Sequence, residues 1–187
     1  GLDLGPVVAV DCETMGLVPQ RDRLCLVQLS GGDGAAHLVQ VAHGQAAAPN
    51  LSRMLTDREV LKLFHFGRFD IAVLFHAFGA LAGPVYCTKI ASKLVRTYTD
   101  RHGLKNLCQE LLEIDISKQQ QSSDWGAAEL SEAQMAYAAS DVLYLHRLRD
   151  ALDARLVREG RMALAQACFD FLPTRAQLDL AGWPETD

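Results

Sequence analysis

Residues 7–13, VVAVDCE, combine an apolar run with two closely spaced acids. The first four residues are apolar and mostly β-branched, which predicts a buried strand that delivers Asp11 at its end. Asp11 and Glu13 are two residues apart, so on a strand their side chains point to one face while Cys12 faces the core. Paired carboxylates are costly to bury without a cation or hydrogen-bond donors. The alternative is a solvated strand end, or an N-cap for the segment that follows.

More strands are predicted after this first one. Residues 24–30 and 36–42 predict two strands joined through GGDG, whose glycines and aspartate suit a hairpin turn. The first three strands are therefore expected to be antiparallel. Residues 48–56 predict a short helix and residues 61–66 a fourth strand. A helix with apolar periodicity follows and ends at Gly79, which is a candidate C-cap.

The next part of the chain alternates between short elements and a loop. Residues 85–88 predict a short strand, and helical patterns follow at about 89–97 and 103–113. The segment DISKQQQSSDWG, residues 115–126, is polar and has no periodicity, so an ordered loop is expected there.

The last third of the chain is predicted to be helical. Ser131 is a candidate N-cap for one long amphipathic helix that runs to Gly160, and a second helix is expected over about 161–172, before Pro173. No internal repeat or linker is visible, so residues 1–187 are expected to form one domain. The order of elements predicts an α/β fold with a mixed sheet of about five strands and flanking helices.

Composition excludes several classes of protein. The net charge of −5 argues against a protein that tracks long nucleic acid, but it is compatible with a small nucleotide substrate. No apolar run is long enough to span a bilayer and the first residues show no leader pattern, so we expect a soluble, cytoplasmic protein with no membrane partner. The five cysteines include no CxxC pair, which indicates reduced core residues and no zinc site.

Three more residues are candidates for the site of Asp11 and Glu13. Asp70 stands where a strand ends and a helix begins; its alternative role is to stabilise the first helical turn. Tyr137 and Asp141 are four residues apart, so on a helix they share one face. The alternative is a core tyrosine beside a surface aspartate.

The three groups together resemble the exonuclease motifs of the DEDD superfamily: Asp-x-Glu after a first strand, Phe-Asp opening a helix, and Tyr-x-x-x-Asp in a late helix. The histidine branch of that superfamily places a histidine five residues before the last aspartate, where this chain has Ala136. The chain therefore resembles the tyrosine branch, which includes the ribonuclease D family.

A closer resemblance covers nearly the whole chain and is to the nanoRNase C group of bacterial diribonucleases. It is carried by VDCETMGL, RDRLCLVQLS, FHFGRFD, CTKIASKLVRTYTDRHGLK, SKQQQSSDW and YAASDVLYLHRL. Cys12 and Met15 depart from the expected Thr and Leu. The resemblance implies a ribonuclease H-like exonuclease fold and a ring-like homo-octamer. It also implies 3′-5′ hydrolysis of 5′-phosphorylated RNA dinucleotides to nucleoside 5′-monophosphates. The reaction would use two divalent cations, either Mg²⁺ or Mn²⁺.

The resemblance also implies roles for individual residues. Asp11 would bridge both ions, Glu13 and Asp141 would hold the ion on the side of the attacking water, and Asp70 would support the other ion through water. Tyr137 would orient the attacking water, since a phenol with a pKa near 10 is a weak base at neutral pH. Hard cations prefer such oxygen ligands.

Substrate contacts are predicted from the same motifs and from basic or hydroxyl side chains. Leu17 would wedge against the bases, or it is a loop anchor. Trp125 would stack, or fill the core. Thr14, Met15 and His65 are further candidates. Groups that could bind a 5′-phosphate, or else form a solvated helix face, are Lys89, Ser92, Arg96, Arg101, His102, Lys105 and Lys118.

The tail, about residues 161–187, is rich in apolar residues, which predicts a subunit contact or packing back on the sheet. We expect none of the additional helical RNA-binding (HRDC) domains of ribonuclease D to follow it, which would favour small substrates. One alternative function is broader, ribonuclease D-like trimming of RNA 3′ ends. The other is a non-catalytic RNA-binding module on an inactive exonuclease fold, although all five active-site positions are filled.

Overall fold

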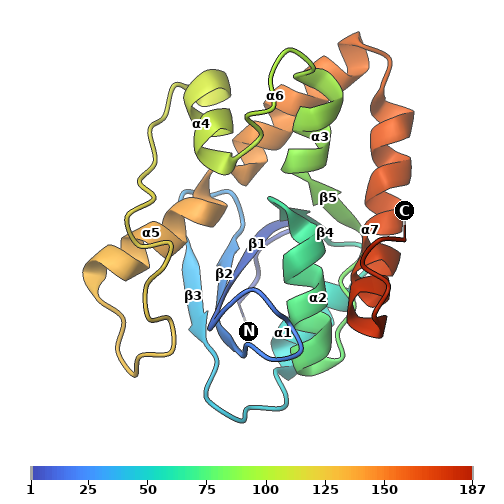
Figure 1. The fold of residues 1–187 in the computed structure, drawn as a ribbon. Coiled ribbons are helices and arrows are strands. Elements are labelled where there is room, and N and C mark those ends of the chain that lie inside the picture. The colour runs from blue at the N-terminus through green and yellow to red at the C-terminus, as the bar shows by residue number, and fades with distance from the viewer. Residues whose placement is uncertain (1, 187) are drawn as a thin grey trace.

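The computed structural model describes residues 2–186, and they form a central sheet with helices packed around it (Figure 1). The sheet has five strands in the order β3-β2-β1-β4-β5. β1 pairs antiparallel with β2 and β2 with β3, whereas β4 runs parallel to β1 and β5 parallel to β4. The predicted mixed α/β sheet is confirmed. Its strands are β1 (Val7–Thr14), β2 (Leu24–Ser30), β3 (His37–Gln40), β4 (Leu61–Phe64) and β5 (Val85–Cys87).

Helices cover the sheet and none of those in the described residues is long and apolar enough to cross a membrane. α2 and α7 pack side by side, α3 packs on α6, and α5 crosses β1, β2 and β3 (Figure 1). The helices are α1 (Pro49–Thr56), α2 (Gly67–Phe78), α3 (Thr88–Val95), α4 (Leu104–Leu112), α5 (Glu132–Leu143), α6 (Leu145–Arg158) and α7 (Met162–Ala181).

The order of the strands brings the chemically distinctive residues to one edge of the sheet. β1 is the central strand, and its residues Val8, Ala9 and Val10 are fully buried. The carboxyl ends of the parallel strands β1 and β4 meet at the same edge, so the residues that follow them come together although they are far apart in the sequence. Four cysteines are buried as predicted, but Cys168 is exposed.

The single long helix predicted from Ser131 to Gly160 is wrong: the structure divides it at Tyr144 into α5 and α6. Ser131 does cap α5, through a reciprocal capping box with Gln134. The reason for the break lies in packing, because α5 lies against β1, β2 and β3, while α6 packs against α3, α4 and α7. One straight helix could not bury both faces.

The predicted end of the last helix before Pro173 is also wrong, since α7 continues to Ala181 with Pro173 inside it. A proline inside a helix removes one hydrogen bond and costs about 3 kcal/mol. Buried side chains on both sides of the proline, Phe169, Leu172 and Ala176, hold α7 against its neighbours and offset that cost.

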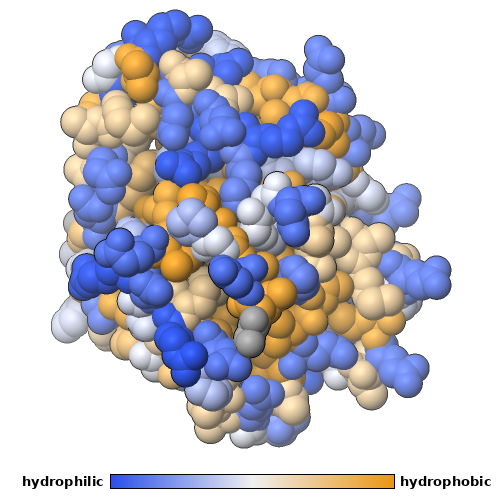
Figure 2. All heavy atoms as spheres, turned by 180° about the vertical axis from the view of Figure 1, so that it is seen from behind, coloured by the Kyte–Doolittle hydropathy of each residue, from blue (hydrophilic) through white to orange (hydrophobic). Residues whose placement is uncertain are grey.

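The tail therefore packs back on the domain with one face, and leaves other apolar side chains in contact with solvent. Leu164, Phe171 and Trp183 remain exposed. Figure 2 shows that the rear face of the molecule carries hydrophobic areas bordered by hydrophilic side chains. The predicted homo-octamer stays a prediction.

Candidate active site

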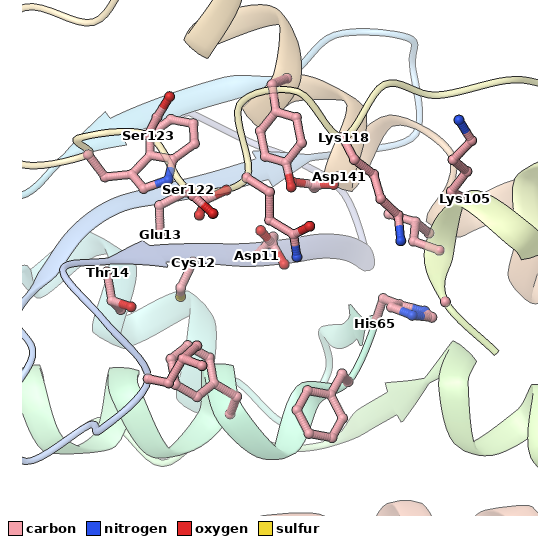
Figure 3. A pocket seen from close by; sticks show the side chains of 18 of the residues that line it. Asp11, Cys12, Glu13, Thr14, His65, Lys105, Lys118, Ser122, Ser123 and Asp141 are labelled. Atoms are coloured by element: carbon pink, nitrogen blue, oxygen red, sulfur yellow. The ribbon is translucent and has the colours of Figure 1, made fainter. Parts of the chain in front are cut away.

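Three carboxylates that are distant in the sequence converge at the carboxyl end of β1. Asp11 and Glu13 project from one face of β1, and Asp141 projects from α5 (Figure 3). One carboxylate oxygen from each residue lies within 4.8 Å of the other two. Asp70, in the first turn of α2, is buried at 4% exposure and interacts electrostatically with Asp11 and Asp141. The structure thus brings three of the four acids together, with Asp70 close enough to interact with them, and their role as metal ligands stays a prediction.

The turn between β4 and α2 determines where Asp70 lies. Phe66 precedes α2 in the left-handed backbone region, with φ 64°, a conformation that bulky residues rarely adopt and that is concentrated at functional sites. Gly67 follows it, and an added Cβ there would lie 2.7 Å from the side chain of Phe64. This tight reversal starts α2 directly after the strand and brings Asp70 beside β1.

The acids repel one another and are shielded from water, so each holds its proton more tightly than usual. Burial, then the charges of Asp70 and Asp141, raise the pKa of Asp11 well above its usual range. Burial raises the pKa of Asp70 to about 8 and that of Asp141 to about 7, and burial followed by the charge of Asp141 raises that of Glu13 to about 8. No positively charged side chain among residues 2–186 lowers the pKa of these four acids, and a bound cation would relieve their repulsion.

A pocket of about 660 Å³ opens in front of the carboxylates. Its lining includes Asp11, Glu13, Asp141 and Tyr137. So do eight of the residues predicted to contact substrate, namely Thr14, Met15, Leu17, His65, Lys89, Lys105, Lys118 and Trp125. Figure 3 shows Lys105 and Lys118 on the side of the pocket away from Glu13. One end of the pocket is therefore acidic and another end basic.

Residues 2–157 match the family model described as 3′-5′ exonuclease. The chain belongs to this 3′-5′ exonuclease family. Among curated relatives of the exonuclease domain, ribonuclease D of Gluconacetobacter diazotrophicus is 40% identical over 157 residues, which are 84% of this chain and 39% of that protein. The chain thus spans about two fifths of the length of the ribonuclease D relatives it matches.

Solved structures of exonuclease-family proteins agree with this assignment. NrnC of Brucella melitensis with bound Mg²⁺ is 63% identical, with a TM-score of 0.94, over 97% of this chain and 89% of that one. NrnC of the same organism bound to pGG is 64% identical, with a TM-score of 0.95, over 97% and 88% of the two chains. Ribonuclease D of Escherichia coli is 27% identical, with a TM-score of 0.82, over 92% and 45%. The chain is a ribonuclease D-like, NrnC-type member of the 3′-5′ exonuclease family, and the predicted exonuclease fold is confirmed.

Tyr137 and Trp125 form the wall of this exonuclease site next to Glu13 and Asp141. Their ring centroids are 5.9 Å apart, and Trp125 is 3% exposed. Burial, then the charges of Asp141 and Glu13, raise the pKa of the Tyr137 phenol well above its usual value. The phenol therefore stays protonated at neutral pH and can donate a hydrogen bond into the pocket.

Four of the predicted substrate contacts lie elsewhere: Ser92, Arg96, Arg101 and His102 do not line the exonuclease pocket. Arg96 is 1% exposed and forms an ion pair with Glu110. Its guanidinium also donates to Ser92 Oγ at 3.0 Å and to the carbonyl of Arg101, while Ser92 Oγ lies 2.8 Å from Nδ1 of His102. The polar groups of this network bind one another between α3 and α4, which is why they are not aimed at the pocket.

Gln28 is a residue of the site that the sequence analysis missed. It is fully buried in β2, opposite Asp11 in the antiparallel register. Its Nε2 donates to Asp11 Oδ2 at 3.0 Å and to Glu13 Oε1 at 3.3 Å. One neutral amide thus orients two carboxylates side by side without adding a charge to the site. A glutamine inside the apolar strand LCLVQLS was the available signal.

Replacing Gln28 with methionine is expected to weaken Mn²⁺ binding by about tenfold, because the side chain keeps its length but no longer orients either carboxylate. Isothermal titration calorimetry measures the change in Kd. Gln40→Met, an equivalent replacement at an exposed position of β3, should leave the Kd unchanged. Equal affinities for wild type and Gln28→Met would show that the amide does not order the site.

Proposed function

We propose that this chain is a metal-dependent 3′-5′ exoribonuclease that hydrolyses very short RNA, most of all 5′-phosphorylated dinucleotides, to nucleoside 5′-monophosphates. The observation that carries the proposal is the convergence of Asp11, Glu13 and Asp141, with Asp70 beside them, at the acidic end of a pocket that has lysines at another end. The NrnC structures with bound Mg²⁺ and with pGG support the choice of metal and of substrate size.

The four acids fit a pair of Mg²⁺ or Mn²⁺ ions. All the ligands that the cluster offers are carboxylate oxygens, which these hard cations prefer. Cys12 is no competitor, because burial and then the charge of Asp70 raise the pKa of its thiol well above the usual value and keep it protonated. When bound, such cations stabilise the negative charge of the phosphate and make water a better nucleophile.

Protein groups would then position the reactants. Tyr137, protonated because of its raised pKa, would donate to the attacking water and orient it, so we assign it a positioning role rather than that of a base. Gln28 would keep Asp11 and Glu13 in one orientation. Leu17, which is 84% exposed at the mouth of the pocket, would bury its side chain against the bases of the substrate.

Recognition of a 5′-phosphate would limit the length of the substrate. Lys89 and Lys118 form no ion pair among residues 2–186, whereas Lys105 pairs with Asp115 at 3.2 Å. Two ammonium groups are thus available for a phosphate at the basic end of the pocket, and a terminal phosphate bound there would exclude a longer chain.

A ladder of 5′-phosphorylated oligoribonucleotides, from two to about seven nucleotides long, tests this proposal. We expect kcat/KM for the dinucleotide to exceed that for the longer substrates by at least about tenfold. Comparable values at every length would favour the broader, ribonuclease D-like trimming activity. If the metal-dependent turnover of wild type were no higher than that of Asp141→Ala, the result would favour the non-catalytic RNA-binding module.

A further inference from the structure

His65 stands at the same edge of the sheet as the carboxylates, but the proposed chemistry does not use it. β4 runs parallel to β1 in a register that pairs Ala9 with Leu63, so the position of His65 is level with that of Asp11. Both residues line the pocket, and Figure 3 shows the imidazole of His65 on the side toward Lys105 and Lys118. The ring is thus placed to meet a molecule whose phosphate lies at the carboxylates.

One hydrogen-bonded chain fixes the proton of this imidazole. Nδ1 of His65 lies 2.8 Å from Oγ1 of the fully buried Thr88, and that hydroxyl donates to the carbonyl of Phe64 at 3.3 Å. A hydroxyl has only one proton to donate. With the Thr88 hydroxyl donating to Phe64, the geometry assigns the proton to Nδ1, which donates to Thr88, and leaves Nε2 without one.

The surroundings keep the ring neutral. Burial, then the positive charge of Lys89, lower the pKa of His65 to about 3. A neutral ring with its proton on Nδ1 presents Nε2 as an acceptor only. Phosphate oxygens are acceptors too, so Nε2 cannot bind them; its partner in a substrate must be a donor. The hydroxyl groups of ribose are the donors common to every dinucleotide, whatever its bases.

We infer that Nε2 of His65 accepts a hydrogen bond from a ribose hydroxyl of the substrate, and that this residue therefore favours RNA over nucleotides that lack the hydroxyl. The inference rests on the proposed exonuclease function and adds a determinant of sugar specificity to it. The lysines of the pocket are suited to phosphate; His65 is suited to the sugar, and this division of roles follows from the donors and acceptors that each side chain offers.

The test compares wild type with two variants on a 5′-phosphorylated diribonucleotide and on its 2′-deoxy and 3′-deoxy analogues. His65→Leu removes the acceptor; His65→Gln can return one, its amide oxygen, near the place of Nε2. We expect His65→Leu to lower kcat/KM for the ribonucleotide by about tenfold. For the analogue that lacks the hydroxyl bound by His65, the same variant should leave kcat/KM unchanged. His65→Gln should recover part of the loss on the ribonucleotide. An equal loss on all three substrates would overturn the inference.

A second readout does not depend on turnover. In ¹⁵N NMR spectra at neutral pH, His65 should show a protonated Nδ1 and an unprotonated Nε2, and Thr88→Val should remove this preference. A proton on Nε2, or a charged ring, would overturn the inference even in an active enzyme. If wild type hydrolyses none of the three substrates, the proposed function fails, while the NMR result still reports on His65.

Discussion

Replacing Asp11 with asparagine is expected to lower kcat for a 5′-phosphorylated dinucleotide by at least about a thousandfold, because the change removes a charge from the centre of the carboxylate cluster. Asp11 interacts with each of the other three acids and accepts a hydrogen bond from Gln28. Asparagine keeps the shape of the side chain and still offers an oxygen to Gln28. The loss would therefore reflect charge rather than packing, and initial rates at saturating Mg²⁺ measure it.

Asp150→Asn is the matched control, since it makes the same chemical change on the exposed side of α6, outside the pocket. Its rates should equal those of wild type. If Asp11→Asn retained more than about a tenth of the wild-type kcat, Asp11 would not belong to the catalytic machinery.

The metal-free protein should lose stability as the pH rises from about 6.5 to 8. Glu13, Asp70 and Asp141 have folded pKa values of about 8, 8 and 7, while their unfolded values lie near 4. Between these values the folded chain binds more protons than the unfolded chain. The free energy of unfolding then falls with pH, by up to about 1.4 kcal/mol per pH unit for each proton, and levels off above the folded pKa values.

Thermal unfolding in EDTA across this window, followed by circular dichroism, measures the effect. Two groups oppose this trend at the edges of the window: His65, with a pKa lowered to about 3, near pH 6.5, and Lys62, with a pKa lowered to about 8, near pH 8. The three raised carboxyl groups outweigh them across the window. Asp11→Asn should flatten the dependence and raise Tm at pH 8, while Asp150→Asn should follow wild type. Excess Mg²⁺ should raise the Tm of wild type more at pH 8 than at pH 6.5. A metal-free Tm that does not change with pH would contradict this account of the cluster.

Much of the site could be predicted from local patterns in the sequence. The apolar run before Asp11 and the two-residue spacing to Glu13 determine a strand and one of its faces. The four-residue spacing of Tyr137 and Asp141 does the same for a helix. Nothing local could show that these faces meet Asp70, and only the resemblance to known exonucleases suggested it.

The errors arise where tertiary packing outweighs local preference. The apolar periodicity from Ser131 to Gly160 continues across Tyr144, so the break between α5 and α6 leaves no local signal. Pro173 is a strong local signal for a helix end, but burial along α7 outweighs it. Arg96 is a charged residue at the end of a helical pattern, so its local sequence predicts a surface position. Its burial and its ion pair with Glu110 depend instead on how α3 meets α4.

Equilibrium binding of Mn²⁺ shows whether the converging acids hold cations before any substrate is present. Calorimetric titration of wild type at pH 8 should show saturable binding of about two ions per chain, and Asp141→Asn should lose at least one of them. Asp150→Asn should bind as wild type does. A chain without saturable binding, or an Asp141→Asn variant that binds Mn²⁺ as tightly and in the same number as wild type, would contradict the account.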